Sequence, residues 1–335
     1  MFISPKRACL AVTTSVVAIL SMTGVVAAAS AMMAATQGPY TIDTYVEPGS
    51  LAPGSDEWQA AFSVDQFDTR DPYPPRISTE GAKKLSVTYK GKALGLDIGR
   101  VFITADLTDT TYRMTYKVQT DGVVRWLDQT EQDVISYGLL DGSEMTALFY
   151  ERDEREGDDT KLIELTRPAP GARFRYWTDP YTELVHPVMP DIGLQTVDPL
   201  AALAQLGFIE VPEGQEPCTR NVAVYDGRRR FDMRMEPAGT ANLSRRGSKR
   251  YSGFTYKCRV FMNKVAGYNQ KNLEDEFDGD GFVYLAPMPE SVASKNFTYM
   301  PVFLEGKTGI LSATLEAKAP TMILPDGTKV ELWKN

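Results

Sequence analysis

The sequence is poor in the residues that build metal centres and nucleophilic sites. Its 335 residues include a single histidine, His186, and three cysteines. A lone histidine without a second His or a Cys beside it argues against a zinc site, and no G-x-S-x-G segment marks a nucleophilic serine. We therefore interpret His186 as an ordinary histidine of a loop or strand end, and we expect no catalytic residue, metal or cofactor.

Positive charge is also scarce. The chain has 36 Lys and Arg against 44 Asp and Glu, which leaves a formal net charge of -8. Proteins that bind nucleic acids mainly through phosphates need a basic surface, so we do not expect nucleic acid as a partner. The hydrophobic share of 43% and the charged share of 24% are those of a folded globular protein.

Long apolar runs are confined to the N-terminus. Lys6 and Arg7 precede a stretch of apolar and small residues that extends from Ala8 to Ala35. Such a stretch, with small residues at Ala29 and Ala31, is typical of a cleavable signal peptide, which we place at residues 1–31. An uncleaved anchor is the alternative, because about 20 apolar residues span a bilayer. We expect a soluble periplasmic protein without a transmembrane segment after cleavage.

The cysteines point to the same compartment. Cys9 belongs to the predicted signal peptide, which leaves Cys218 and Cys258 as an even pair. Disulfides persist in oxidising compartments, and the two residues lack the C-x-x-C spacing of a redox or metal pair. We predict a Cys218–Cys258 disulfide, which would stabilise the fold by about 3–4 kcal/mol.

The composition divides the remaining chain into two parts. Residues 32–80 are rich in Pro, Gly and Asp, which resist regular structure, and we interpret them as an N-terminal extension laid on the main domain. Residues 81–335 are predicted to form a single antiparallel β domain, because alternating segments recur throughout them.

Alternation of apolar and polar residues dominates from Lys84 onward, as in the series Leu85, Val87 and Tyr89. This period of two predicts antiparallel strands with one buried face. We expect about fourteen strands in a large curled antiparallel sheet, an incomplete barrel or spiral, because wide open sheets tend to curl or close. Comparable alternation occurs at 112–118, 231–235, 254–262 and 311–317, and a hairpin is predicted at 321–333.

One short helix is predicted in the segment VDPLAALAQLGF. Asp198 can accept hydrogen bonds from the first turn, Pro199 suits the first helical position, and Gly207 suits a left-handed stop. Leu200, Leu203 and Leu206 share roughly one face, which could plug the curled sheet.

A charged run from Tyr150 to Lys161 contains the carboxylates Glu154, Glu156, Asp158 and Asp159. Carboxylates of this kind can act as general acids and bases in a hydrolase. Clustered charges between two strand patterns more commonly form a hairpin tip, which is the interpretation we adopt.

Arginines are concentrated in the segment YDGRRRFDMRM. After a turn at Asp226–Gly227, alternation places Arg228, Arg230 and Arg234 on the polar face, whereas Arg229 points the other way with a stem that can reach water. Guanidinium groups suit phosphates and carboxylates, so an anion-binding surface is one hypothesis. A solvated strand face that discourages edge pairing is the alternative. The hypothesis includes a second basic patch with Arg245 and Arg246.

Several of these segments resemble one family. The stretch CTRNVAVYDGRRRFDMRM, then YSGFTYKCRVFMNKVAGY and PVFLEGKTGILSATLEA, is similar to bacterial envelope proteins grouped as domain-of-unknown-function family 3108. The likeness covers about residues 82–318 and is most specific at Cys218, the Asp226–Arg230 segment, Cys258 and Gly267–Tyr268. The resemblance implies an exported envelope protein, and it transfers no catalytic residue.

Three functions are compatible with these observations. The first is a non-enzymatic periplasmic envelope protein whose curved sheet binds an apolar, lipid-like ligand or supports envelope integrity. The second is a scaffold for lipoproteins or other envelope partners. The third is a hydrolase that acts on cell-wall polymer through carboxylates.

Overall fold

The computed structural model of the protein describes most of the chain from residue 77 onward. The predicted signal peptide, nearly all of the extension, Arg245 and Arg246 lie outside the described residues. The described residues are 39–42, 77–121, 130–156, 159–166, 173–177, 184–186, 188, 196–210, 215–244, 251–270, 273, 281–308 and 311–333.

These residues form one 15-stranded antiparallel sheet that does not close into a barrel, which confirms the predicted mostly β fold. At one edge of the sheet, β1 (Pro39–Ile42) pairs with β8 (Arg173–Trp177). Strand β17 (Lys329–Glu331) pairs with β16 (Leu311–Ile323) and lies off the main strand order. A separate small sheet joins β9 (Leu184–His186) to β13 (Tyr268–Asn269). The order across the large sheet is β1 (Pro39–Ile42), β8 (Arg173–Trp177), β7 (Asp159–Thr166), β6 (Glu144–Glu156), β5 (Thr130–Asp141), β4 (Thr111–Thr120), β3 (Leu96–Leu107), β2 (Lys83–Ala93), β16 (Leu311–Ile323), β15 (Tyr299–Thr308), β14 (Gly281–Pro287), β12 (Gly253–Ala266), β11 (Arg230–Leu243) and β10 (Asn221–Tyr225).

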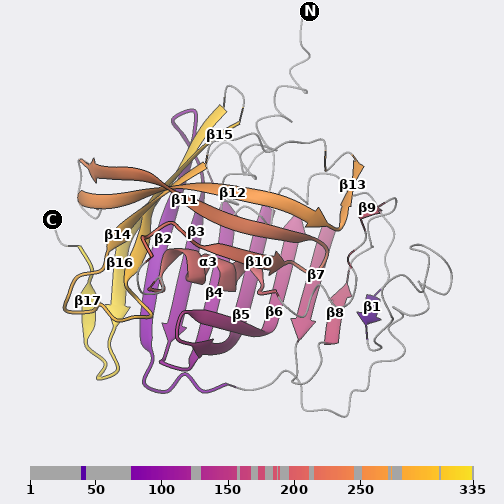
Figure 1. The fold of residues 1–335 in the computed structure, drawn as a ribbon, viewed down its shortest axis with the longest axis horizontal. Helices are drawn as coiled ribbons and strands as arrows, with labels where there is room; N and C mark the ends of the chain where they lie inside the picture. The colour runs from indigo at the N-terminus through magenta and orange to yellow at the C-terminus, as the bar shows by residue number, and fades with distance from the viewer. Residues whose placement is uncertain are drawn as a thin grey trace, which may run out of the picture.

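The sheet curls back over itself. Strands β2 to β8 stand side by side, and the long β11–β12 ribbon crosses their face with the helix α3 (Pro199–Gly207) between the two layers (Figure 1). Strands β16, β15 and β14 form the bend that links the two layers. The interior therefore lies between the crossing ribbon and the face of β2 to β7.

The predicted alternation is present in most strands. Leu85, Val87 and Tyr89 of β2 and Tyr112 and Met114 of β4 are buried, while the residues between them are more exposed. Each strand therefore turns one row of apolar side chains toward the interior, which is the burial that stabilises an antiparallel sheet with a wet outer face.

Strand β12 departs from the predicted burial. Cys258 is the only buried residue of the row predicted to face the interior, and Phe254 is 41% exposed. That row consists of Phe254, Tyr256, Cys258, Val260 and Met262. Among the described residues, β14 pairs with β12 only from Tyr256 to Val260. The ribbon consequently extends beyond its neighbours and leaves part of its inner face open to solvent.

The predicted helix is present as α3 (Pro199–Gly207). The amides of Leu200 and Ala201 donate to the Asp198 carboxylate at 2.9 and 3.0 Å, which confirms the predicted N-cap. The prediction for Gly207 was wrong, because Gly207 is the last helical residue and Phe208 follows at φ -115°. A Cβ on Gly207 would lie 2.7 Å from Cγ of Pro301, so the glycine permits close packing on β15.

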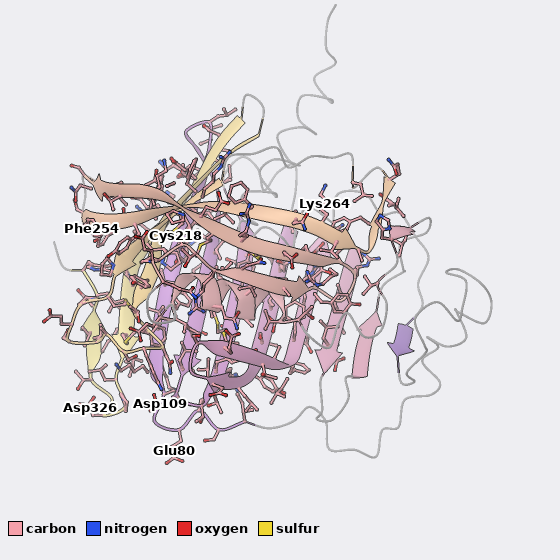
Figure 2. The ribbon with its side chains drawn as sticks, in the orientation of Figure 1. Glu80, Asp109, Cys218, Phe254, Lys264 and Asp326 are labelled. Atoms are coloured by element: carbon pink, nitrogen blue, oxygen red, sulfur yellow. A yellow bond between two sulfur atoms is a disulfide. The ribbon has the colours of Figure 1, made fainter. Side chains whose placement is uncertain are left out.

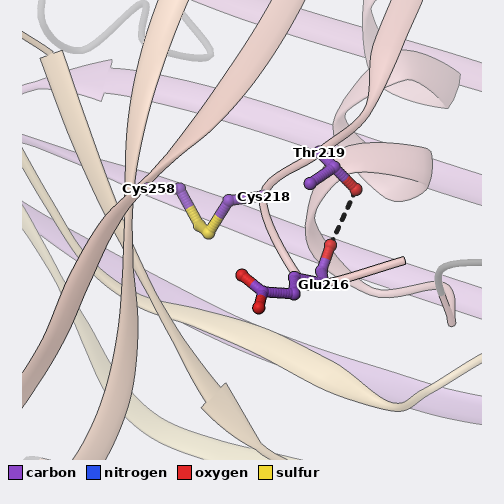
Figure 3. The surroundings of a disulfide bond; sticks show 4 residues. All are labelled: Glu216, Cys218, Thr219 and Cys258. Carbon is purple, nitrogen blue, oxygen red and sulfur yellow. Dashed lines mark hydrogen bonds between the residues drawn. A yellow bond between two sulfur atoms is a disulfide. The ribbon is translucent and has the colours of Figure 1, made fainter. Parts of the chain in front are cut away.

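The predicted disulfide joins Cys218 to Cys258 across a Cα–Cα distance of 5.2 Å. Figure 3 shows that it ties the segment before β10 to the middle of β12, beside a turn in which Thr219 Oγ1 donates to the Glu216 carbonyl at 2.8 Å. The bond therefore holds the crossing ribbon to the chain that leaves the helix.

Candidate functional site

An apolar pocket lies between α3, strands β2 and β3, the β11–β12 ribbon and strands β14 to β16. It offers about 40 Å³ of space to the centre of a water-sized sphere. Tyr89 is the single lining residue with a polar side-chain atom, and the rest of the lining is apolar or glycine. Residues that define its walls include Ile103, Leu206, Met233, Met235 and Leu304.

The polar atom of the pocket is already engaged. The Tyr89 hydroxyl donates to the Pro301 carbonyl at 2.7 Å, and burial raises the pKa of Tyr89 above its ordinary value. No donor or acceptor among the lining side chains is thus left to hold water, and apolar cavities of this kind stay dry. The pocket is suited to an apolar group rather than to a polar ligand.

The mouth of the pocket lies at two residues. Leu203 of α3 and Val260 of β12 are partly exposed, whereas the other lining residues are buried. On the same inner face of β12, partly exposed apolar side chains continue on both sides of Val260. We call Phe254, Tyr256, Val260 and Met262 the inner strip.

A second interior region contains charged residues. Arg152 Nη2 lies 3.0 Å from Glu154 Oε2, and both side chains are almost completely buried. Gln132 Nε2 also donates to Glu154, at 2.9 Å. Strands β6 and β7 do form the predicted hairpin, with Glu156 opposite Asp159, but Glu154 points into the interior rather than standing in solvent at the tip.

The N-terminus of α3 meets this region. Ser136 Oγ donates to Asp198 Oδ2 at 2.7 Å, so one carboxylate both caps the helix and bonds to β5. The Tyr150 hydroxyl is buried beside these groups and has no hydrogen-bond partner among the described residues. Burial raises the pKa of Tyr150, opposed by Arg152 and assisted by the carboxylates of Asp226, Asp198 and Glu154.

The turn between β10 and β11 closes the region from the other side. Asp226 Oδ1 accepts hydrogen bonds from the amides of Arg228 and Arg229 at 2.9 and 2.7 Å. The prediction that Arg229 reaches water was wrong, because its side chain is buried with the guanidinium 5.4 Å from the centre of the Tyr268 ring. We call Arg152, Glu154, Asp198, Asp226 and Arg229 the charged layer.

The burial of Arg229 has a backbone cause. Gly267, at φ +81°, packs so closely on the turn that a Cβ there would lie 2.1 Å from the Arg228 carbonyl oxygen. The corner after β12 therefore covers the turn and encloses the Arg229 side chain. No signal in the sequence distinguishes this arginine from its neighbours.

Three arginines of the predicted anion-binding surface, Arg228, Arg230 and Arg234, are partly or largely exposed. Arg230 pairs with Asp232 at 2.7 Å, and Arg234 pairs with Glu236 and lies 4.7 Å from the centre of the Phe261 ring. Arg228 is partly buried at the turn. Anion binding by Arg228, Arg230 and Arg234 stays a prediction, as it does for Arg245 and Arg246.

His186 lies in β9, where its carbonyl accepts a hydrogen bond from the Gly267 amide at 2.7 Å. Within the described ranges, no three His, Cys, Asp or Glu side chains are grouped as metal ligands. None of the described helices has the length and apolar character needed to cross a membrane.

The pocket and the charged layer therefore differ in what they offer to a ligand. The pocket has unfilled space with apolar walls, whereas the charged groups bond to one another, to the helix cap and to backbone amides. The pocket with its mouth is the candidate binding site, and the sequence patterns located its strands without revealing the space between them.

Comparison with known proteins identifies the family of the sequence. A family model described as "Protein of unknown function (DUF3108)" matches residues 84–316, and no curated protein matches the chain. Among solved structures, the chain is similar to a beta-barrel-like protein of domain of unknown function DUF1849 from Brucella abortus. That likeness has 8% sequence identity and a TM-score of 0.39, and it covers 72% of this chain and 97% of that one. With its match over residues 84–316, this chain belongs to the DUF3108 family.

Proposed function

We propose that this protein is an exported, periplasmic protein of the cell envelope that binds the apolar chain of a lipid-like molecule. The observation that carries the proposal is the apolar pocket below α3 with its mouth at Leu203 and Val260. The signal-like N-terminus and the Cys218–Cys258 disulfide support export, because disulfides persist outside the cytosol.

Binding would be driven by burial of apolar surface. An alkyl group that enters a dry apolar cavity leaves water and gains contacts with the walls, at about 25 cal/mol for each Å² removed from solvent. Met233 and Met235 form part of the wall, and their flexible side chains can adjust to chains of different shape.

The size of the cavity limits what enters. Its volume of about 40 Å³ is small, since one buried water already needs about 10–15 Å³ on the same measure. The pocket can therefore accept the end of one alkyl chain, and the rest of that chain must lie outside the mouth. The inner strip provides apolar, partly exposed surface for this remainder.

A substitution at the mouth tests the proposal. Val260→Trp places a large ring at the entrance, while Val265→Trp alters an exposed valine of the same strand that does not line the pocket. We expect native mass spectrometry of protein from an envelope fraction to show bound lipid in the wild type and in Val265→Trp, and none in Val260→Trp. Wild-type protein that carries no lipid would contradict binding and favour a scaffold, whereas a Val260→Trp variant that retains lipid would contradict this pocket as the binding site.

The export component has its own test. Protein recovered from the periplasm should have lost about the first 31 residues and should contain no free thiol. Intact N-terminal sequence or two titratable sulfhydryl groups in that fraction would contradict export independently of the lipid measurement.

A further inference from the structure

The inner face of β12 changes from apolar to cationic along its length. Register pairs Met235 with Val260, Met233 with Met262, and the fully buried Phe231 with Lys264, so these β12 residues share the inner face. Figure 2 labels Phe254 at one end of the ribbon and Lys264 toward the other. The inner strip thus runs from an aromatic end, past the mouth of the pocket, to a lysine.

A second cation shares the Tyr268 ring with Lys264. Lys264 Nζ is 5.8 Å and the Arg229 guanidinium is 5.4 Å from the centre of the same Tyr268 ring. The backbone amide of Arg229 donates a hydrogen bond to the Asp226 carboxylate at 2.7 Å. Lys264 is partly exposed and Arg229 is buried, so Lys264 is the cation that a ligand on the inner strip can reach.

We propose that the site binds an anionic amphiphile with a single alkyl chain. The carboxylate or phosphate headgroup lies at Lys264, and the chain follows Met262 and Val260 into the pocket. This inference rests on the proposed function and adds the headgroup charge and the number of chains. Charge complementarity supports it, because the partly exposed Lys264 ends the inner strip and would face the anionic headgroup.

The dimensions agree with one chain. Four residues of strand separate Lys264 from Val260, a distance of about 13 Å at the usual rise per residue. With C–C bonds of about 1.5 Å, roughly ten extended methylene groups span this distance. The cavity of about 40 Å³ then accepts the end of the chain and has no space for a second one.

A lysine on the opposite face of the same strand provides the control. Lys257 lies on the outer face, 3.3 Å from the Glu305 carboxylate and 4.0 Å from the centre of the Phe282 ring. Its side chain cannot reach the inner strip through the sheet, although Lys257 and Lys264 are only seven residues apart. Replacement of either lysine by Met removes one charge and keeps an unbranched side chain.

The experiment compares two probes with the same hydrocarbon chain, oleate and oleyl alcohol, by calorimetric titration of the full protein. We expect the wild type and Lys257→Met to bind oleate about fivefold more tightly than the alcohol at low salt, the ratio expected for one partly exposed ion pair. In Lys264→Met the two affinities should become equal, with the affinity for the alcohol unchanged.

The outcomes separate the two proposals. Equal affinities for both probes in the wild type, or an oleate preference that survives Lys264→Met, would overturn the headgroup inference and leave the apolar pocket in place. Absence of binding by either probe would overturn the proposed function and this inference together. Loss of alcohol binding in Lys264→Met would also contradict a purely electrostatic role of that lysine.

Discussion

The two interior regions on either side of α3 are stabilised by different means. The pocket region consists of apolar side chains around unfilled space, whereas the charged layer consists of five ionisable groups that are each at most 5% exposed. The helix takes part in both, since Asp198 caps it within the charged layer while Leu203 and Leu206 line the pocket. The pocket region can adapt to a bound ligand, and the charged layer fixes the position of the β10–β11 turn.

The contrast follows from the physics of each kind of contact. Apolar contacts are non-directional, so a cavity costs stability but tolerates rearrangement. Buried charges require partners at defined positions, because an uncompensated charge in the interior is strongly unfavourable. Binding is therefore expected in the pocket region, while the charged layer fixes the β10–β11 turn, whose Gly227 packs against Ile163 of β7.

The largest effect is expected when the charged layer loses one charge. Arg152→Met removes the guanidinium next to Glu154 and should lower the free energy of unfolding by about 3–5 kcal/mol. The double variant Arg152→Met/Glu154→Leu removes both charges and should recover much of this loss. Urea unfolding measures both, and equal losses in the single and double variants would contradict charge pairing as the cause.

The next largest loss of stability is expected when the disulfide that holds the ribbon is removed. Its loop spans 40 residues of sequence, and the chain-entropy model assigns such a loop about 3–4 kcal/mol. Cys218→Ala/Cys258→Ala should lower the free energy of unfolding by this amount, with reduced wild type behaving alike. A loss below about 1 kcal/mol would show that the ribbon is held by packing alone.

A matched pair of valines tests the unfilled space. Val283 lines the pocket, whereas Val224 is fully buried in β10 and is not among the lining residues. Val283→Ile should raise the free energy of unfolding by up to about 0.8 kcal/mol, the value of one buried methylene. Val224→Ile should lower it by about 1–3 kcal/mol through overpacking. Equal effects in thermal or urea unfolding would contradict the difference in packing.

Two buried tyrosines provide a smaller contrast. The Tyr89 hydroxyl donates to the Pro301 carbonyl, whereas the Tyr150 hydroxyl has no partner among the described residues. Tyr89→Phe should lower the free energy of unfolding by about 1 kcal/mol through the lost hydrogen bond. Tyr150→Phe should change it by less than about 0.5 kcal/mol. A larger loss for Tyr150→Phe would indicate a polar partner that Tyr150 alone engages.

The contribution of both tyrosines to the free energy of unfolding should depend on pH in the same direction and should not change near neutral pH. Burial raises the pKa of Tyr89 and Tyr150 above the ordinary value of 10.0, so the folded protein holds protons that the unfolded chain releases. Their contribution is fully present below pH 10 and is lost as the pH rises above it. Absorbance at 295 nm should show both phenols ionising only as the protein unfolds, and ionisation in the folded state would contradict their burial.

The class of fold could be predicted from the sequence because alternation is a local signal. Leu85, Val87 and Tyr89 show it directly, and the cap at Asp198 depends only on its own following amides. The disulfide followed from the number of cysteines and the expected compartment. These features need no knowledge of which strands pair across the molecule.

The site could not be predicted, because it depends on contacts between distant segments. Arg152 and Glu154 look like part of a solvated charge run, and only the fold places Gln132 and the Asp226 turn beside them. The sequence predicts a local stop signal at Gly207, although the role of this glycine is set by Pro301 of β15. The cavity depends on packing around α3, which alternation does not encode.

The pairing of β2 with β16 means that the large sheet cannot finish folding until the C-terminal strands have been synthesised. Leu85 lies opposite Met322, so this seam of the sheet joins two strands that are far apart in the sequence. A ribosome delivers β2 long before β16, and until then β2 presents an unpaired edge to other chains. The nascent protein would therefore benefit from a holding chaperone until its last strands emerge.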